Sequence, residues 1–251
     1  MTESSSHVWV TQVTYIRFVI VDFIAVGLYR MGLKSQLVLR FLVAIAVFGA
    51  LLFIPAGSFA FWQGWAYLNI CFVSGLFAFV YFYKHDPELI RRRTMFKEKV
   101  REQKRIMALV YVIWPIVFSL PGLDHRYGWS RLPLWLTVLA QAVVLAGYWM
   151  TFWVAKVNRF AARTIQVEPD QTVVSTGPYS VVRHPMYLGM CLIWLFTPLA
   201  LSSYITLPAF ALFIPLIILR LLNEEKVLCQ ELPGYPEYCS HTHYHLVPYV
   251  W

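Results

Sequence analysis

Long apolar stretches separated by short polar connections dominate the chain. Residues 37–61, 62–83 and 134–155 each provide the roughly 20 predominantly apolar residues that an α-helix needs to cross the hydrocarbon core of a bilayer. Residues 106–122 form a further candidate span, which Pro115 should kink. The pattern therefore predicts a bundle of transmembrane helices.

Two other apolar stretches need a separate interpretation. Residues 7–32 contain three charged side chains, so they form either a weak span or a helix lying in the membrane interface. The run 186–222 has Arg220 as its only charge and, as one helix, would extend about 55 Å, nearly twice the roughly 30 Å hydrocarbon core. A break at 198–204 would make it a helical hairpin. We therefore expect an all-α, multipass transmembrane bundle of six or seven spans with a C-terminal helical hairpin.

Composition and charge support a membrane protein. Hydrophobic residues make up 59% of the chain and charged residues only 14%, against about 25% charged in soluble domains. The net charge of +8 alone would also suit a nucleic-acid partner, but nine of the 21 Lys and Arg residues lie within 84–105, beside predicted spans. This placement favours a cytoplasmic basic loop and no nucleic acid.

The predicted topology divides the chain in two. Residues 1–105 should comprise N-terminal interfacial or transmembrane helices and the basic cytoplasmic loop. Residues 106–251 should form a second transmembrane module, which would be the catalytic one in an enzyme. The polar segments 156–185 and 223–251 flank the last hairpin, so both should lie on the cytoplasmic face. That face is where we expect a site.

Residues that can carry chemistry gather where a loop meets the hydrophobic helix that begins near residue 185. Pro185 suits a first helical turn, so the backbone N–H groups at this helix end should point into the polar layer, where an anion could bind. Gly177 and Gly189 permit close backbone approach, while Tyr179 and Tyr187 offer aromatic faces to a cation or a flat ring.

Two further polar groups follow downstream. Arg220 and Glu224 are four residues apart, which places them on one helix face. The stretch 234–238, Gly-Tyr-Pro-Glu-Tyr, introduces a turn. Histidines at 241, 243 and 245 alternate, but without a carboxylate or thiol at a recognised ligand spacing we expect no metal site.

In the three stretches 177–189, 224–225 and 234–238 the chain resembles the superfamily of isoprenylcysteine carboxyl methyltransferases and phospholipid methyltransferases. The signature combines Gly-x-Tyr-x-x-x-Arg-His-Pro-x-Tyr-x-Gly, here residues 177–189, with a downstream Glu-Glu pair, here 224–225, and a Gly-x-x-x-Tyr element, here 234–238. The resemblance covers residues 158–251. It implies an integral membrane methyltransferase that uses S-adenosylmethionine as cofactor, without a soluble Rossmann domain.

The resemblance also implies roles for individual residues. Those similar to the family's cofactor contacts are Gln166, Gln171, Thr172, Val173, Val174, Tyr179, His184, Pro185, Met186, Tyr187, Glu224 and Glu225. Among them, Glu225, together with Glu224, resembles the carboxylate that receives the cofactor's amino group. Arg220 is the nearest match to the arginine that orients an acceptor carboxylate. The expected catalytic residues are Arg220 and His184.

The chemistry of methyl transfer leaves the acceptor open. A carboxylate acceptor is already ionised at neutral pH and needs no base, whereas a thiol or amine must lose a proton, for which His184 is a candidate base. The resemblance favours a prenylcysteine carboxylate or a similar lipophilic small acceptor that enters from the bilayer. A phospholipid or thiol methyltransferase of the same superfamily is an alternative.

Two other classes of function are weaker interpretations. Sterol reductases share a related C-terminal architecture and bind NADPH, but few arginines near the expected site are available to hold a phosphorylated dinucleotide. A transporter or scaffold would place polar residues along a path at mid-depth, whereas the charges here gather at the cytoplasmic ends of the spans.

Overall fold

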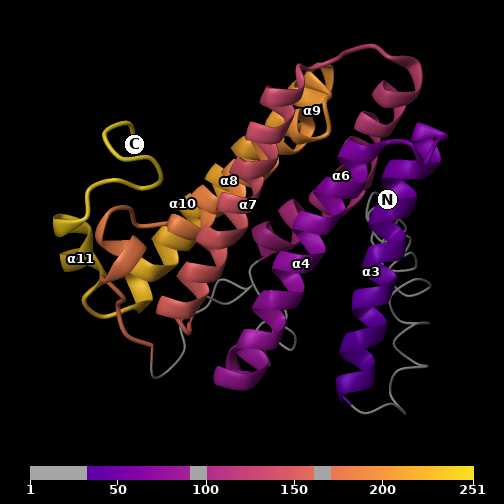
Figure 1. Cartoon of the computed structure of the whole chain (residues 1–251). Coiled ribbons are helices and arrows are strands. Elements are labelled where there is room, and N and C mark those ends of the chain that lie inside the picture. The colour runs from indigo at the N-terminus through magenta and orange to yellow at the C-terminus, as the bar shows by residue number, and fades with distance from the viewer. Residues whose placement is uncertain (1–32, 91–100, 161–170) are drawn as a thin grey trace, which may run out of the picture. The chain divides into compact units, whose positions relative to one another are not determined.

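The computed structural model describes residues 33–90, 101–160 and 171–251 (Figure 1). Every regular element within these ranges is helical, which confirms the predicted all-α class. In chain order the elements are α3 (Leu33–Ala56), α4 (Trp62–His85), α6 (Arg101–Tyr127), α7 (Leu134–Val157), the 3₁₀ helix η2 (Gly177–Ser180), α8 (Pro185–Ala200), the 3₁₀ helix η3 (Tyr204–Thr206), α9 (Leu207–Ala211), α10 (Phe213–Glu231) and α11 (Tyr235–His241).

The chain forms two compact units, residues 1–48 and 49–251. Of the first unit, the structure describes only 33–48, the first part of α3. The candidate span 7–32 lies outside the described residues. The predicted division at residue 105 concerns function rather than compactness and stays a prediction. Everything that follows concerns the second unit.

Three helical segments are long and apolar enough to cross a membrane. They are Trp62–His85, Leu134–Val157 and Tyr204–Glu231, the last of which joins η3, α9 and α10. Phe41–Ala56 and Pro185–Ala200 are shorter apolar helices among the described residues. These helices agree with a membrane bundle, while the count of six or seven spans stays a prediction.

The break predicted within the long apolar run 186–222 occurs where α8 ends. The helix stops at Ala200, and Ser202 takes a positive φ of 59° in the turn that leads to η3. The chain then returns through α9 into α10. Tyr187 near the start of α8 packs in one buried cluster with Leu221 of α10. The beginning of α8 therefore lies beside the C-terminal part of α10; that the pair crosses the bilayer as a hairpin stays a prediction.

Helix α6 extends further than the sequence pattern suggested. It runs through Pro115 and Pro121 to Tyr127, so it continues beyond the end of the predicted span 106–122. Asp124 explains the difference, because this buried carboxylate accepts a hydrogen bond from the backbone N–H of Ser130 at 2.7 Å and also bonds the hydroxyls of Ser130 and Ser203. These bonds join the loop after α6 to the turn after α8.

Helices α7 and α8 lie side by side and make the most extensive helix–helix contact among the described elements (Figure 1). Two glycines make this possible. A Cβ atom added at Gly147 would stand 2.7 Å from Cγ1 of Ile193 and 2.9 Å from the carbonyl oxygen of Gly189. A Cβ added at Gly189 would stand 2.9 Å from Cγ2 of Thr151. The close backbone approach expected for Gly189 is confirmed, and it fixes the signature helix against α7.

This contact yields a test of the fold. Gly147→Ala should lower the free energy of unfolding by about 1–3 kcal/mol, because the added methyl meets the backbone of α8. The matched control is Gly49→Ala in α3, where an added Cβ meets nothing within 4 Å. Since alanine favours a helix more than glycine, this control should be neutral or stabilise by about 0.5–1 kcal/mol. Thermal unfolding of the two variants in detergent measures both effects; equal destabilisation would contradict the packing described.

Candidate functional site

The site begins at the N-terminus of α8. Pro185 occupies the first helical turn and is buried, as its fixed φ and missing N–H favour. The two preceding backbone N–H groups are used by the C-terminal tail, defined here as residues 242–251. Arg183 N–H donates to the carbonyl of Tyr244 at 2.9 Å, and His184 N–H donates to the carbonyl of His245 at 3.0 Å. The tail thus pairs directly with the start of the signature helix.

Arg183 fastens three segments together. Its Nη1 donates to Oε1 of Glu225 at 2.7 Å, its Nε to the carbonyl of Thr242 at 2.6 Å and its Nη2 to the carbonyl of Cys239 at 3.0 Å. Burial by itself would lower the pKa of Arg183, but the hydrogen bond and charge of Glu225 outweigh it and raise the pKa. The guanidinium therefore remains charged while it joins the segment before α8 to α10, to α11 and to the residue that follows α11.

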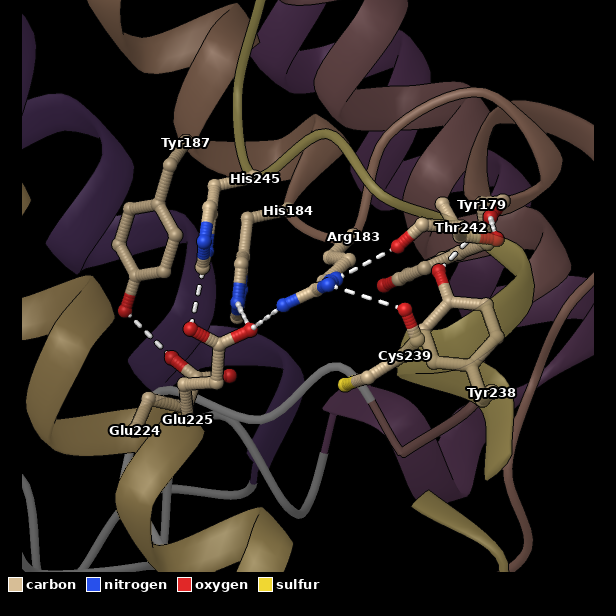
Figure 2. Close-up of polar contacts among 10 residues, drawn as sticks. All are labelled: Tyr179, Arg183, His184, Tyr187, Glu224, Glu225, Tyr238, Cys239, Thr242 and His245. Atoms are coloured by element: carbon tan, nitrogen blue, oxygen red, sulfur yellow. Dashed lines mark hydrogen bonds and ion pairs between the residues drawn. The ribbon is translucent and has the colours of Figure 1, made fainter. Parts of the chain in front are cut away.

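Glu225 is the centre of this polar group (Figure 2). Besides the arginine, its Oε1 lies 3.9 Å from Nε2 of His184, and its Oε2 lies 2.9 Å from Nδ1 of His245. The side chain of Glu225 is only 12% exposed. We call Arg183, His184, Glu225 and His245 the Glu225 cluster. A carboxylate surrounded by one permanent cation and two imidazoles is well stabilised in its ionised form.

A second polar group, next to the first, is formed by Tyr187, Glu224 and Arg220. The Tyr187 hydroxyl donates to Oε2 of Glu224 at 2.5 Å and accepts from Nε of Arg220 at 3.1 Å. Tyr187 itself is buried. The helical spacing expected to align Arg220 and Glu224 is thus realised, with one tyrosine hydroxyl bonded to both side chains.

Tyr179 is held in place from three sides. Its hydroxyl accepts from Nδ2 of Asn158 at 2.9 Å, and its carbonyl accepts from the hydroxyl of Tyr238 at 2.7 Å and that of Thr242 at 3.5 Å. Burial raises the pKa of Tyr238 to about 12, so its hydroxyl is a neutral donor. The Gly-x-x-x-Tyr element of the signature therefore supports the loop before α8.

The other predicted site residues are distributed as follows. Val173 packs against the buried cluster of Leu232, Tyr235 and Tyr238, which joins the loop before η2 to α11. Pro185 is buried at the start of α8. In the same two segments Gln171, Val174 and Met186 are half-buried and Thr172 is exposed. Gln166 lies outside the described residues. That these residues contact a cofactor stays a prediction.

Three buried polar atoms next to these groups have no hydrogen-bond partner: Nε2 of His184, Nδ1 of His245 and the hydroxyl oxygen of Tyr235. The two imidazole nitrogens are within ion-pair distance of Glu225. Burial raises the pKa of Tyr235, and the charge of Glu225 raises it further, so the phenol is neutral. A buried polar group without a partner is costly in a folded protein. The Tyr235 hydroxyl is therefore available to a polar group of a ligand.

The arrangement offers carboxylate and aromatic partners to a small ligand that has a cationic group and a flat ring. Glu224 and Glu225 contribute negative charge, while Tyr187 and Tyr235 provide aromatic surface beside the two carboxylates. S-adenosylmethionine carries an ammonium, a sulfonium and an adenine ring, so the residues present suit it. Among the residues that the structure describes, no group of three or more His, Cys, Asp or Glu could hold a metal ion.

Three residues of the site had no predicted role. Arg183 lies inside the signature, but only the structure shows that it contacts Glu225 across 42 positions of sequence. His245 lies far from the signature in the sequence, and its contact with Glu225 depends on how the tail folds back. For Tyr235 the signal in the sequence is the preceding Gly234. This glycine takes a φ of 82° immediately before α11 and sets the direction of the next side chain.

Arg183 yields a test of the cluster's structural role. Arg183→Lys keeps the charge but cannot reach three acceptors in three directions, so it should lower the free energy of unfolding by about 2–4 kcal/mol. The matched control is Arg131→Lys, an exposed arginine in the loop after α6, which should change stability by less than about 0.5 kcal/mol. Thermal unfolding in detergent measures both. If Arg183→Lys were as stable as the control, the three-way contact would carry no stability.

Comparison with known proteins supports the same region. Residues 135–232 match the family model described as phospholipid methyltransferase. A curated relative, the cobalt-zinc-cadmium resistance protein CzcN of Cupriavidus metallidurans, is 30% identical over 137 residues, which cover 52% of this chain. The chain spans 60% of the length of that relative. The matched range contains α7, η2, α8 and α10 with the paired glutamates. The predicted resemblance is thereby confirmed: residues 135–232 match the phospholipid methyltransferase family, part of the isoprenylcysteine and phospholipid methyltransferase superfamily.

Proposed function

We propose that this protein is an integral membrane methyltransferase that transfers a methyl group from S-adenosylmethionine to a lipophilic small acceptor. One observation carries the proposal. The signature residues 183–187 and the pair Glu224–Glu225 are about 40 positions apart in sequence, yet they contact one another directly at the start of α8. The buried hydroxyl of Tyr235, which feels the charge of Glu225, has no hydrogen-bond partner.

The cofactor would be held by the residues that carry negative charge and aromatic surface. Glu224 and Glu225 stabilise a positively charged ligand, and the rings of Tyr187 and Tyr235 lie beside them. His184 Nε2 and the Tyr235 hydroxyl contribute hydrogen-bonding groups. S-adenosylmethionine, when bound, supplies the methyl group on a sulfonium that leaves as a neutral thioether. The protein's part is to position donor and acceptor in line and to exclude water.

For the acceptor, the group around Arg220 is the best candidate. Its Nε bonds Tyr187, and its position on α10 is one helical turn before Glu224. A guanidinium there would orient a carboxylate acceptor, and such a group is ionised without a base. We therefore favour a prenylcysteine carboxylate or a similar acceptor. If the acceptor were a thiol or an amine, His184 Nε2 is the atom that would take its proton.

The membrane supplies the route for a lipophilic acceptor. α8 and α10 are apolar helices whose polar ends form the site. An acceptor with a hydrocarbon chain partitions into the bilayer and would reach these ends laterally. We place this face in the cytoplasm, because nine basic residues lie within 84–105 and basic loops remain on the cytoplasmic side. The partners are then membrane lipids and the lipidic acceptor.

Ligand binding tests the cofactor. S-adenosylhomocysteine should raise the thermal unfolding midpoint of the purified protein, while NADPH should not, because only a ligand that binds the native state stabilises it. Glu224→Gln should weaken S-adenosylhomocysteine binding by roughly tenfold or more, as expected for a charged hydrogen bond. Its matched control is Glu237→Gln on the exposed side of α11. Stabilisation by NADPH instead would favour the reductase interpretation and overturn the proposal.

Methyl transfer tests the acceptor. Prenylcysteine analogues, aminophospholipids and small thiols are offered in detergent, and release of S-adenosylhomocysteine is measured. We expect the prenylcysteine carboxylate to be the best acceptor and Arg220→Gln to raise its KM more than tenfold, since the carboxylate loses a charged partner. Faster turnover of an aminophospholipid or thiol, with a pH dependence removed by His184→Gln, would replace the carboxylate by that acceptor.

A further inference from the structure

The C-terminal tail folds back on itself next to the Glu225 cluster. The carbonyl of Trp251 accepts hydrogen bonds from the backbone N–H groups of Leu246 at 3.0 Å and Val247 at 3.1 Å. Tyr249 takes a positive φ of 64° within this turn, and Leu246 is buried in the cluster that also contains Tyr187. The backbone hydrogen bonds and the buried side chain of Leu246 therefore hold this turn in place.

This fold places the Trp251 ring on the ring of His245. The two ring centroids are 4.9 Å apart, and the planes are inclined by 23°, so the rings are stacked. On the same imidazole, Nδ1 lies 2.9 Å from Oε2 of Glu225. The backbone carbonyl of His245 is fixed by the N–H of His184. His245 is thus fixed at its main chain and over one ring face, while Nδ1 lies at ion-pair distance from Glu225 without a hydrogen-bond partner.

We propose that Trp251 is a positioning residue of the site: it holds the His245 ring in the orientation that contacts Glu225, and thereby completes the binding of a cationic cofactor. The ligand in this statement rests on the proposed function, whereas the stacking does not. The residue acts through His245 and needs no contact with substrate or cofactor of its own.

Physical reasons favour this role over a purely structural one. An imidazole fixed only at its main chain can rotate about two side-chain torsions, and each rotation would remove Nδ1 from Glu225. The indole blocks one of the two ring faces and restricts that rotation. The charged groups that face this imidazole are Glu225 from α10 and, through it, Arg183 and His184 at the start of α8.

The purified protein in detergent provides the test, as a double-mutant cycle over Trp251→Leu and His245→Gln. S-adenosylhomocysteine affinity is measured by titration, and the thermal unfolding midpoint of each variant without ligand is measured separately. The matched control is Trp129→Leu, which removes another exposed tryptophan that stacks on a ring, that of Tyr127, at 5.3 Å outside the site. Trp251→Phe keeps an aromatic face at the position.

We expect Trp251→Leu to weaken S-adenosylhomocysteine binding by roughly threefold to tenfold, as for loss of a stacked ring pair. In the His245→Gln background the same change should have no additional effect, and Trp251→Phe should restore binding to within about twofold of the wild type. Trp129→Leu should leave affinity unchanged. A merely structural tryptophan would lower the unfolding midpoint without this dependence on His245.

Other outcomes separate the two proposals. Additive effects of Trp251→Leu and His245→Gln on affinity, or a Trp251→Phe variant as weak as Trp251→Leu, would overturn the positioning role. If the wild-type protein does not bind S-adenosylhomocysteine, the proposed function fails. In that case the cycle on unfolding midpoints still decides the inference: coupling between Trp251 and His245 supports the contact, and additive midpoints overturn it.

Discussion

The ion pair between Arg183 and Glu225 is the interaction on which the site depends. It joins the chain immediately before α8 to the C-terminal half of α10, two parts separated by an apolar run that turns at residues 201–203. Both side chains are largely shielded from water, so neither could remain charged there alone without a large desolvation cost. The arginine's other donors extend the connection to the carbonyls of Cys239 and Thr242. One guanidinium thereby sets the positions of the segments that surround it.

The two glutamates of the site are held by different side chains. Arg183 and the tail hold Glu225, while Tyr187 holds Glu224 and Arg220 in the adjacent group. Within such a region of low dielectric, fixed charges act on a bound cation more strongly than they would in water. The two glutamates are consecutive in sequence but have different partners, so they provide one carboxylate bound mainly by cationic and imidazole side chains and another bound by a tyrosine hydroxyl.

Much of the fold could be predicted because apolar length and polar breaks are local properties of the sequence. The spans 62–83 and 134–155 and the break near residue 200 correspond closely to α4, α7 and the end of α8. The signature likewise identified His184, Tyr187 and the glutamate pair. What could not be predicted depends on distant contacts. The length of α6 depends on how Asp124 bonds Ser203, 79 positions away, and the role of His245 depends on how the tail returns to α8.

Asp124 also has a mechanical consequence for the site. Its hydrogen bonds attach Ser203, just beyond the C-terminal end of α8, to the loop after α6. The signature lies at the other end of this 16-residue helix, about 24 Å away at 1.5 Å per residue. Because that remote end is anchored, sliding of α8 along its axis is resisted. A tilt about the anchored end would displace Tyr187 and the residues before it the most.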